Sequence, residues 1–145
     1  MSMKLRQLEA ADKVAVQELF GVCFAQDAYY CRLLDDTENM GCTFAESLAY
    51  CLGNGLSRGV FDGQQLVAFA LLLDYGQTRR EQPNMFDEIF GRAPGQPKSY
   101  EEALHQRIQA LEGQVLYLLS LAVAPAYRRQ GLAAGLVDTV LEAYP

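Results

Sequence analysis

The stretch that decides the fold is residues 115–143, which reads VLYLLSLAVAPAYRRQGLAAGLVDTVLEA. Residues 115–123 form an apolar run with the length and composition of a β-strand. Pro125 ends this run, and a basic turn, Arg-Arg-Gln-Gly at 128–131, follows it. Apolar residues then recur at helical spacing: Leu132, Leu136, Val137, Val140 and Leu141. The pattern predicts a strand, a tight turn and an amphipathic helix.

The junction between this strand and this helix favours an anion. The first turn of a helix has backbone N–H groups without intrahelical partners and carries roughly half a positive charge. Residues 113–137 contain no Asp or Glu, although about three would be expected at the average acid frequency of the chain. A buried strand beside a helix face could also lack acids for structural reasons alone. We predict a phosphate-bearing ligand at residues 129–133.

The bulk properties fit a single globular domain. The chain has 145 residues, of which 50% are hydrophobic, and a formal net charge of −6. This acidic balance argues against binding to nucleic acid or to an anionic membrane surface. No C-x-x-C motif occurs, and His105 is the one histidine, so we predict no metal site. The first residues do not resemble a signal peptide, so we expect a cytoplasmic protein. The sequence does not decide whether disulfides form among its four cysteines, Cys23, Cys31, Cys42 and Cys51.

The first half of the chain predicts two helices and three strands. A short strand is expected at 4–8, and a helix capped by Asp12 should follow, with an inner face made of Val14, Leu19, Phe20 and Cys23 or Phe24. Thr43 and Glu46 form a capping box for a second helix that runs to about residue 52. Strands at 57–61 and 65–74 should pair through an Asp62-Gly63 hairpin. The apolar run at 66–73 predicts a strand covered on both faces.

Residues 76–113 are predicted to be a long, partly helical insertion between two strands. Ser99 and Glu102 form a capping box at the start of its helix. His105 lies off the apolar stripe of that helix, which favours a surface role over a catalytic one. Tyr29 and Tyr30 follow the first helix and could either line a substrate pocket or pack in the core.

Residues 119–133 resemble the acetyl-CoA-binding motif of the GNAT superfamily of N-acetyltransferases. The motif of that family is Arg/Gln-x-x-Gly-x-Gly/Ala after a strand that ends in Leu-x-Val-x-Pro, and here it reads Arg128-Arg129-Gln130-Gly131-Leu132-Ala133 after Leu121-Ala122-Val123-Ala124-Pro125. The upstream order of elements also resembles the N-terminal half of the family. The resemblance implies an α+β fold, with a central mixed, mostly antiparallel sheet flanked by helices.

The resemblance also implies where acetyl-CoA binds. The backbone of Leu121, Ala122 and Val123 would pair with the pantetheine arm as if it were an extra strand. The pyrophosphate would be held at the turn and the helix start by Arg128, Arg129, Gln130, Gly131, Leu132 and Ala133. Gly131 would leave the space that the phosphate needs. No metal is implied.

The implied reaction is transfer of an acetyl group from acetyl-CoA to a primary amine, with the acceptor, the base and the acid unassigned. The sequence departs from the family pattern, because its strand lacks the glutamate that many members use as a base. The strands and the helix that follow the motif helix in the family are also missing, so residues 1–145 are expected to be one truncated domain whose sheet a homodimer or strand exchange completes. The alternatives are a catalytically silent acyl-CoA-binding or assembly module and a turn with no ligand.

Overall fold

A four-stranded antiparallel sheet forms the centre of the molecule. The computed structural model describes residues 3–25, 27, 45–74 and 116–143. The strands are β1 (Met3–Gln7), β2 (Arg58–Asp62), β3 (Gln65–Asp74) and β4 (Leu116–Val123), and they lie in the order β1-β2-β3-β4. Each neighbouring pair is antiparallel. The predicted α+β class is confirmed.

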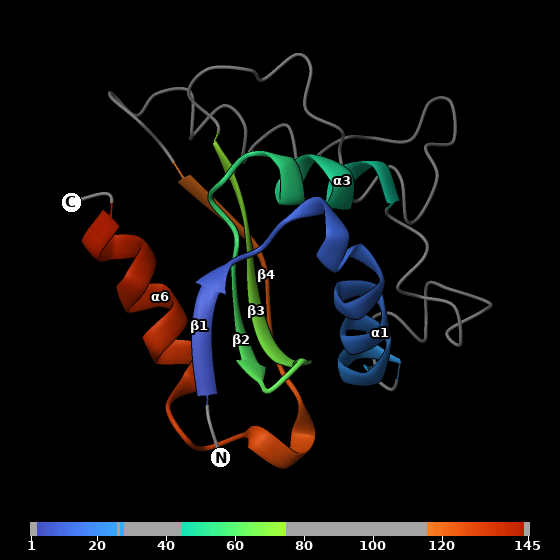
Figure 1. Ribbon diagram of the computed structural model, residues 1–145, viewed down its shortest axis with the longest axis vertical. Coiled ribbons are helices and arrows are strands. Elements are labelled where there is room, and N and C mark those ends of the chain that lie inside the picture. The colour runs from blue at the N-terminus through green and yellow to red at the C-terminus, as the bar shows by residue number, and fades with distance from the viewer. Residues whose placement is uncertain (1–2, 26, 28–44, 75–115, 144–145) are drawn as a thin grey trace.

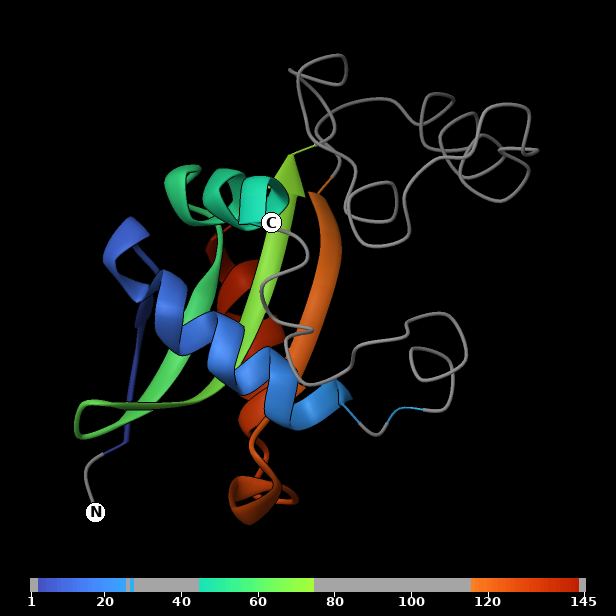
Figure 2. The ribbon, with the colours of Figure 1, turned by 90° about the vertical axis from the view of Figure 1, so that its right-hand side faces the viewer.

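Helices cover both faces of this sheet. α1 (Lys13–Phe24) and α3 (Ala45–Gly53) lie on one face, and α6 (Leu132–Ala143) lies on the other (Figures 1 and 2). Two hydrophobic clusters fill the two interfaces. On β3, Phe69 and Leu71 belong to the cluster under α1 and α3, whereas Ala70 and Leu72 belong to the cluster under α6. Alternate side chains of a strand point to opposite faces, so β3 contributes to both halves of the core.

β3 matches its prediction closely. The expected strand at 65–74 is observed as Gln65–Asp74, and all eight residues from 66 to 73 are buried. The predicted hairpin is also present, because β2 and β3 are antiparallel and Gly63 adopts a left-handed φ of 62°. A continuous apolar run therefore did mark a strand that is covered on both faces.

The first helix required one correction. The predicted inner face included Val14, but Val14 is 62% exposed, while Val16, Leu19 and Phe20 are buried. A short 3-10 turn, η1 (Ala10–Asp12), precedes α1, and the buried stripe of α1 starts at Val16. Val14 precedes Val16 by two positions, about 200° around the helix, and it therefore faces away from the sheet.

Asp12 is the N-cap residue of α1, as predicted, but its carboxylate accepts no hydrogen bond from the backbone of that helix. It accepts a hydrogen bond from the backbone N–H of Glu9 at 2.8 Å and two from the guanidinium of Arg6. The bond from Arg6 lowers the pKa of Asp12. The predicted caps at Thr43 and Ser99, the insertion at 76–113, and the side chains of Tyr29, Tyr30 and His105 lie outside the described residues.

β4 lies at the edge of the described sheet and contains a bulge. Leu71 pairs with Ser120 and Leu72 pairs with Leu118, so Leu119 is an extra residue on β4. Opposite this bulge, the Ser57 hydroxyl accepts a hydrogen bond from the Leu72 N–H, and the Asn54 amide donates one to the Leu72 carbonyl. These two side chains precede β2, so they continue the hydrogen-bonded ladder past its N-terminal end and fix β3 beside the bulge.

Candidate functional site

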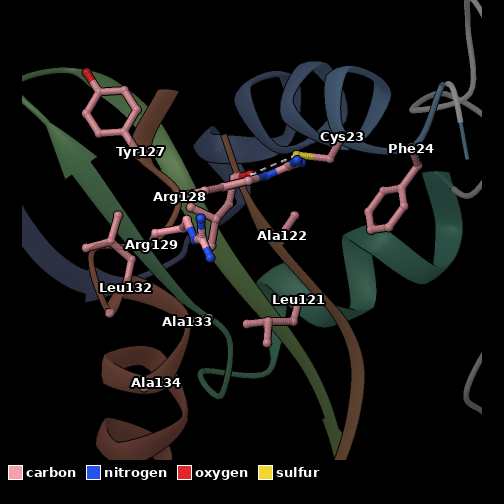
Figure 3. A pocket seen from close by; sticks show the side chains of 12 residues that line it. Cys23, Phe24, Leu121, Ala122, Tyr127, Arg128, Arg129, Leu132, Ala133 and Ala134 are labelled. Carbon is pink, nitrogen blue, oxygen red and sulfur yellow. Dashed lines mark hydrogen bonds between the residues drawn. The ribbon is translucent and has the colours of Figure 1, made fainter. Parts of the chain in front are cut away.

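A cavity opens where the C-terminal end of α1, the end of β4 and the start of α6 meet (Figure 3). Its volume is about 520 Å³. Two lining residues come from α1 and three from β4, and the others belong to the turn after β4 and to the first residues of α6. The lining residues are Cys23, Phe24, Leu121, Ala122, Val123, Tyr127, Arg128, Arg129, Gly131, Leu132, Ala133 and Ala134.

The backbone of β4 presents polar groups at this cavity. The N–H of Ala124 donates to the carbonyl of Val67 at 2.7 Å, so Ala124 directs its backbone groups toward β3. In an antiparallel ladder, successive residues direct these groups to opposite sides. Leu121 and Val123 therefore direct their N–H and C=O groups away from β3, toward the open edge that borders the cavity.

Val123 already has partners at this edge. Its carbonyl oxygen accepts a hydrogen bond from Nε of Arg128 at 3.0 Å and one from Sγ of Cys23 at 3.5 Å (Figure 3). Burial raises the pKa of the Cys23 thiol, while the neighbouring Arg128 opposes this shift. An extended ligand that paired with the full edge of β4 would therefore have to displace Arg128 and Cys23 from the Val123 carbonyl.

The turn that follows β4 has an unusual backbone. After the 3-10 turn η3 (Pro125–Tyr127), Arg129 has φ 65° and Gly131 has φ 79°. Glycine adopts this left-handed region freely, whereas a residue with a side chain pays about 1–2 kcal/mol. A Cβ atom added at Gly131 would meet no heavy atom within 4 Å, so the space in front of this residue is open.

The turn leads into the N-terminus of α6, where positive charge collects. The Gly135 N–H donates to the Gly131 carbonyl at 3.0 Å as the helix begins, and the N–H groups just before it have no intrahelical acceptor. The side chains of Arg128 and Arg129 are exposed beside them. Among the described residues the ion pair is between Arg6 and Asp12, so no described carboxylate pairs with either arginine of the turn. The geometry and the charge suit an anionic group.

Tyr127 connects the turn after β4 to the β2–β3 hairpin. Its hydroxyl donates to the Asp62 carboxylate at 2.7 Å. This hydrogen bond raises the pKa of Tyr127 above its ordinary value. The ring packs against the cluster under α6. Sequence analysis assigned no role to Tyr127, because its partner lies 65 residues away in the chain.

The predicted binding residues converge on this cavity, with one exception. Leu121, Ala122, Val123, Arg128, Arg129, Gly131, Leu132 and Ala133 all line it, whereas Gln130 is exposed and is not among the lining residues. Sequence analysis placed Cys23 or Phe24 on the inner face of the first helix and named neither among the cofactor-binding residues. No local pattern could show that the end of α1 reaches a strand 100 residues later.

A strand whose edge borders a cavity, followed by a left-handed turn and a helix N-terminus, defines an α+β protein whose site suits an extended ligand with an anionic end. Residues 37–145, which are 109 of the 145 in the chain, match the model of the acetyltransferase (GNAT) family. The chain belongs to this family. A comparison with curated protein sequences finds no significant match.

Solved structures share the fold. The polyamine N-acetyltransferase of Drosophila melanogaster has a TM-score of 0.68 and 14% identity, over 98% of this chain and 70% of its own. Arylalkylamine N-acetyltransferase 2 of Aedes aegypti has a TM-score of 0.68 and 16% identity, over 99% and 70%. The PaiA N-acetyltransferase of Thermoplasma acidophilum, solved with coenzyme A, has a TM-score of 0.56 and 13% identity, over 99% and 72%. At these identities the likeness concerns the fold.

None of the described helices is long and apolar enough to cross a membrane. In the same part of the chain, His, Cys, Asp and Glu side chains form no group of three or more that could hold a metal ion.

Proposed function

We propose that this chain binds acetyl-CoA in the cavity between α1, β4 and α6 and transfers the acetyl group to a primary amine. Family membership indicates acyl-CoA-dependent acetyl transfer as the general activity. One observation carries the finer proposal. The outward-facing backbone of β4 and the left-handed turn before α6 border the same cavity, so one extended ligand with a phosphate end can reach both.

The turn and the start of α6 would hold the pyrophosphate. The N–H groups at the beginning of α6 point along the helix axis, and the dipole of the helix favours negative charge there. Arg128 and Arg129 would add charge-assisted hydrogen bonds. The open space in front of Gly131 would accommodate a phosphate oxygen without a side chain in its way.

The edge of β4 would hold the pantetheine arm. Leu121 offers an N–H and a C=O in the direction that an added strand needs. The Val123 carbonyl could join this pairing once Arg128 has turned toward the pyrophosphate. The side chains of Phe24 and Leu121 would cover the arm with apolar surface, since both line the cavity.

The chemistry requires an amine without its proton at the thioester carbonyl and a proton for the departing thiolate. We assign neither proton transfer to a described residue. Amines are the acceptors that we propose to test first, because the polyamine and arylalkylamine acetyltransferases share the fold. A catalytically silent acyl-CoA-binding module remains the second candidate, since the same observations support binding alone.

A thermal-shift experiment tests the binding. Acetyl-CoA at about 100 times its Kd should stabilise the protein by about 2.7 kcal/mol. Gly131→Glu should abolish this shift, because the carboxylate would occupy and repel the phosphate position. Gly55→Glu is the matched control: it adds the same charge at another left-handed glycine, with φ 75°, where the nearest atom to an added Cβ is Nε2 of Gln7 at 3.4 Å. An unchanged shift in Gly131→Glu would remove the proposed phosphate site.

A thiol-release assay separates the enzyme from the silent module. We expect free coenzyme A to accumulate when the protein, acetyl-CoA and a panel of agmatine, spermidine and arylalkylamines are combined. Release must depend on the amine and be lost in Gly131→Glu. Ligand-induced stabilisation without release for any amine would favour the silent module.

We also propose that a homodimer or strand exchange completes the sheet at β4, in a cytoplasmic protein whose residues 1–145 form one domain. The part of β4 before Leu121, which the proposed pantetheine arm does not reach, pairs with β3 alone among the described strands, and its other edge is able to pair with a second chain. Light scattering at micromolar concentration should show a dimer, and a monodisperse monomer would contradict this proposal.

A further inference from the structure

The turn between β4 and α6 needs support from outside itself. Arg129 and Gly131 are both left-handed within three residues, and Arg129 pays a free-energy cost for this conformation. Such a backbone persists only where surrounding contacts hold it. The contacts that hold the turn therefore decide whether its N–H groups are already aligned when a ligand arrives.

Two side-chain hydrogen bonds connect this turn, at residues 127 and 128, to other described residues. The first joins Arg128 to the Val123 carbonyl on β4, and the second joins Tyr127 to Asp62 on the β2–β3 hairpin. Arg128 lines the cavity, and in the proposed function it moves to the phosphate, so its bond to Val123 is lost on binding. The bond from Tyr127 is the one that can persist in both states.

Tyr127 lines the cavity, but its hydroxyl is directed away from the proposed phosphate position. Its hydroxyl points away from the guanidinium groups of Arg128 and Arg129 (Figure 3). The acceptor of its bond is firmly placed, since Asp62 pairs with Met3 on β1 and with Gln65 on β3. The ring of Tyr127 packs against the cluster under α6, as does Leu132 at the start of that helix. Tyr127 thus connects the turn to three strands and to the base of α6.

We propose that Tyr127, through its hydrogen bond to Asp62, is a positioning residue for the phosphate-binding turn. This inference rests on the proposed binding of acetyl-CoA. The bond holds residues 128–131 in the left-handed arrangement that aligns the N–H groups of α6 and leaves the space at Gly131 open. Tyr127 contributes to recognition of the pyrophosphate without touching it, and it contributes nothing to recognition of the pantetheine arm.

The test compares two ligands on Tyr127→Phe, which removes the hydroxyl and keeps the ring. Isothermal titration should show the affinity for coenzyme A falling about five-fold, the size of the net contribution of one ordinary hydrogen bond. The affinity for pantetheine, which has the arm and no phosphate, should be unchanged in ligand-observed NMR. Thr139→Val is the matched control, because it removes a hydroxyl that bonds only within α6, to the Gly135 carbonyl at 2.8 Å.

Asp62→Ala completes the experiment as the second half of a double-mutant cycle. It should weaken coenzyme A binding as much as Tyr127→Phe does, and the double variant should lose no more than either single variant. An unchanged affinity for coenzyme A in Tyr127→Phe, an equal loss for both ligands, or additive losses in the cycle would each overturn the inference. Failure of the unmodified protein to bind coenzyme A would instead overturn the proposed function.

Discussion

β3 and β4 are both long apolar strands, yet the fold uses them differently. Residues 66–73 of β3 are all buried, whereas Ala122 is the buried residue of β4 and Leu118 is 42% exposed. β3 pairs on both sides and has helices on both faces, while β4 pairs with β3 alone among the described strands. The comparison teaches that apolar sequence does not distinguish a strand that is enclosed in the core from one whose edge borders a cavity.

The largest expected effect is on β3. Phe69 is fully buried, so Phe69→Ala should reduce the free energy of unfolding by about 3–5 kcal/mol. Urea unfolding followed by circular dichroism measures this change. Leu118→Ala on β4 is the control, and it should change stability by about 0.5 kcal/mol or less because that side chain is already exposed. Equal losses in the two variants would show that β4 is as well covered as β3.

The second prediction concerns two glycines at the start of α6, Gly131 in the turn before the helix and Gly135 in its first turn. Gly131 and Gly135 are joined by one hydrogen bond, and a Cβ at either position meets nothing within 4 Å. Gly131→Ala should still destabilise the protein by about 1–2 kcal/mol, because its φ is 79°. Gly135→Ala should stabilise it by about 0.5–1 kcal/mol, since alanine favours the helix. Urea unfolding that gives both changes the same sign would contradict the left-handed turn.

The third prediction concerns the arginine that bonds the outward carbonyl of β4. Arg128→Met should weaken coenzyme A binding about ten-fold or more in isothermal titration, because a charge-assisted bond to phosphate is lost. The melting temperature should change little, since the side chain is exposed. Arg58→Met removes the same charge from β2, where the guanidinium bonds the Gly55 carbonyl, and it should leave the affinity unaltered. Equal loss in both variants would indicate only a general effect of net charge.

The smallest expected effect is a difference between two thiols. Cys51 lies in the same cluster as Phe69 of β3, and burial raises its pKa to about 12. Burial also raises the pKa of Cys23 beside β4 above the ordinary 9.0, but Cys23 is partly exposed. Because the thiolate is the reactive form, iodoacetamide should modify Cys23 with a midpoint above pH 9.0 and leave Cys51 unmodified until unfolding. Peptide mass spectrometry measures the alkylation rates of both cysteines, and faster alkylation of Cys51 than of Cys23 would contradict this prediction.

The elements with a strong local signal were predicted well. The apolar run at 66–73 and the Asp62-Gly63 turn predicted β3 and its hairpin correctly, because composition, run length and turn chemistry are local properties. Val14 was misplaced because it was assigned from its apolar character, whereas Val16, three and four positions before Leu19 and Phe20, has the helical spacing of the buried stripe. The bulge at Leu119 has no sequence signature, because it lies where β3 has passed the first residue of β2 and bonds to Ser57 and Asn54 instead.

The candidate site divides in the same way. The residues from Leu121 to Ala133 could be named from the motif, because strand, turn and helix are contiguous and their backbone geometry is set locally. Cys23, Phe24 and the bond between Tyr127 and Asp62 could not, since each reaches the site from an element far away in the chain.

The sequence alone determined that a strand feeds a helix through a basic, glycine-bearing turn, because hydrophobic period, proline and glycine act over a few residues. The tertiary structure alone decided that β3 is enclosed while β4 borders a cavity. It also decided that Arg128 and Cys23 share the Val123 carbonyl and that Asp62 holds Tyr127. The physical reason is that burial and hydrogen-bond partners depend on which elements pack together, and residues 65 or 100 positions apart meet only once the sheet has formed.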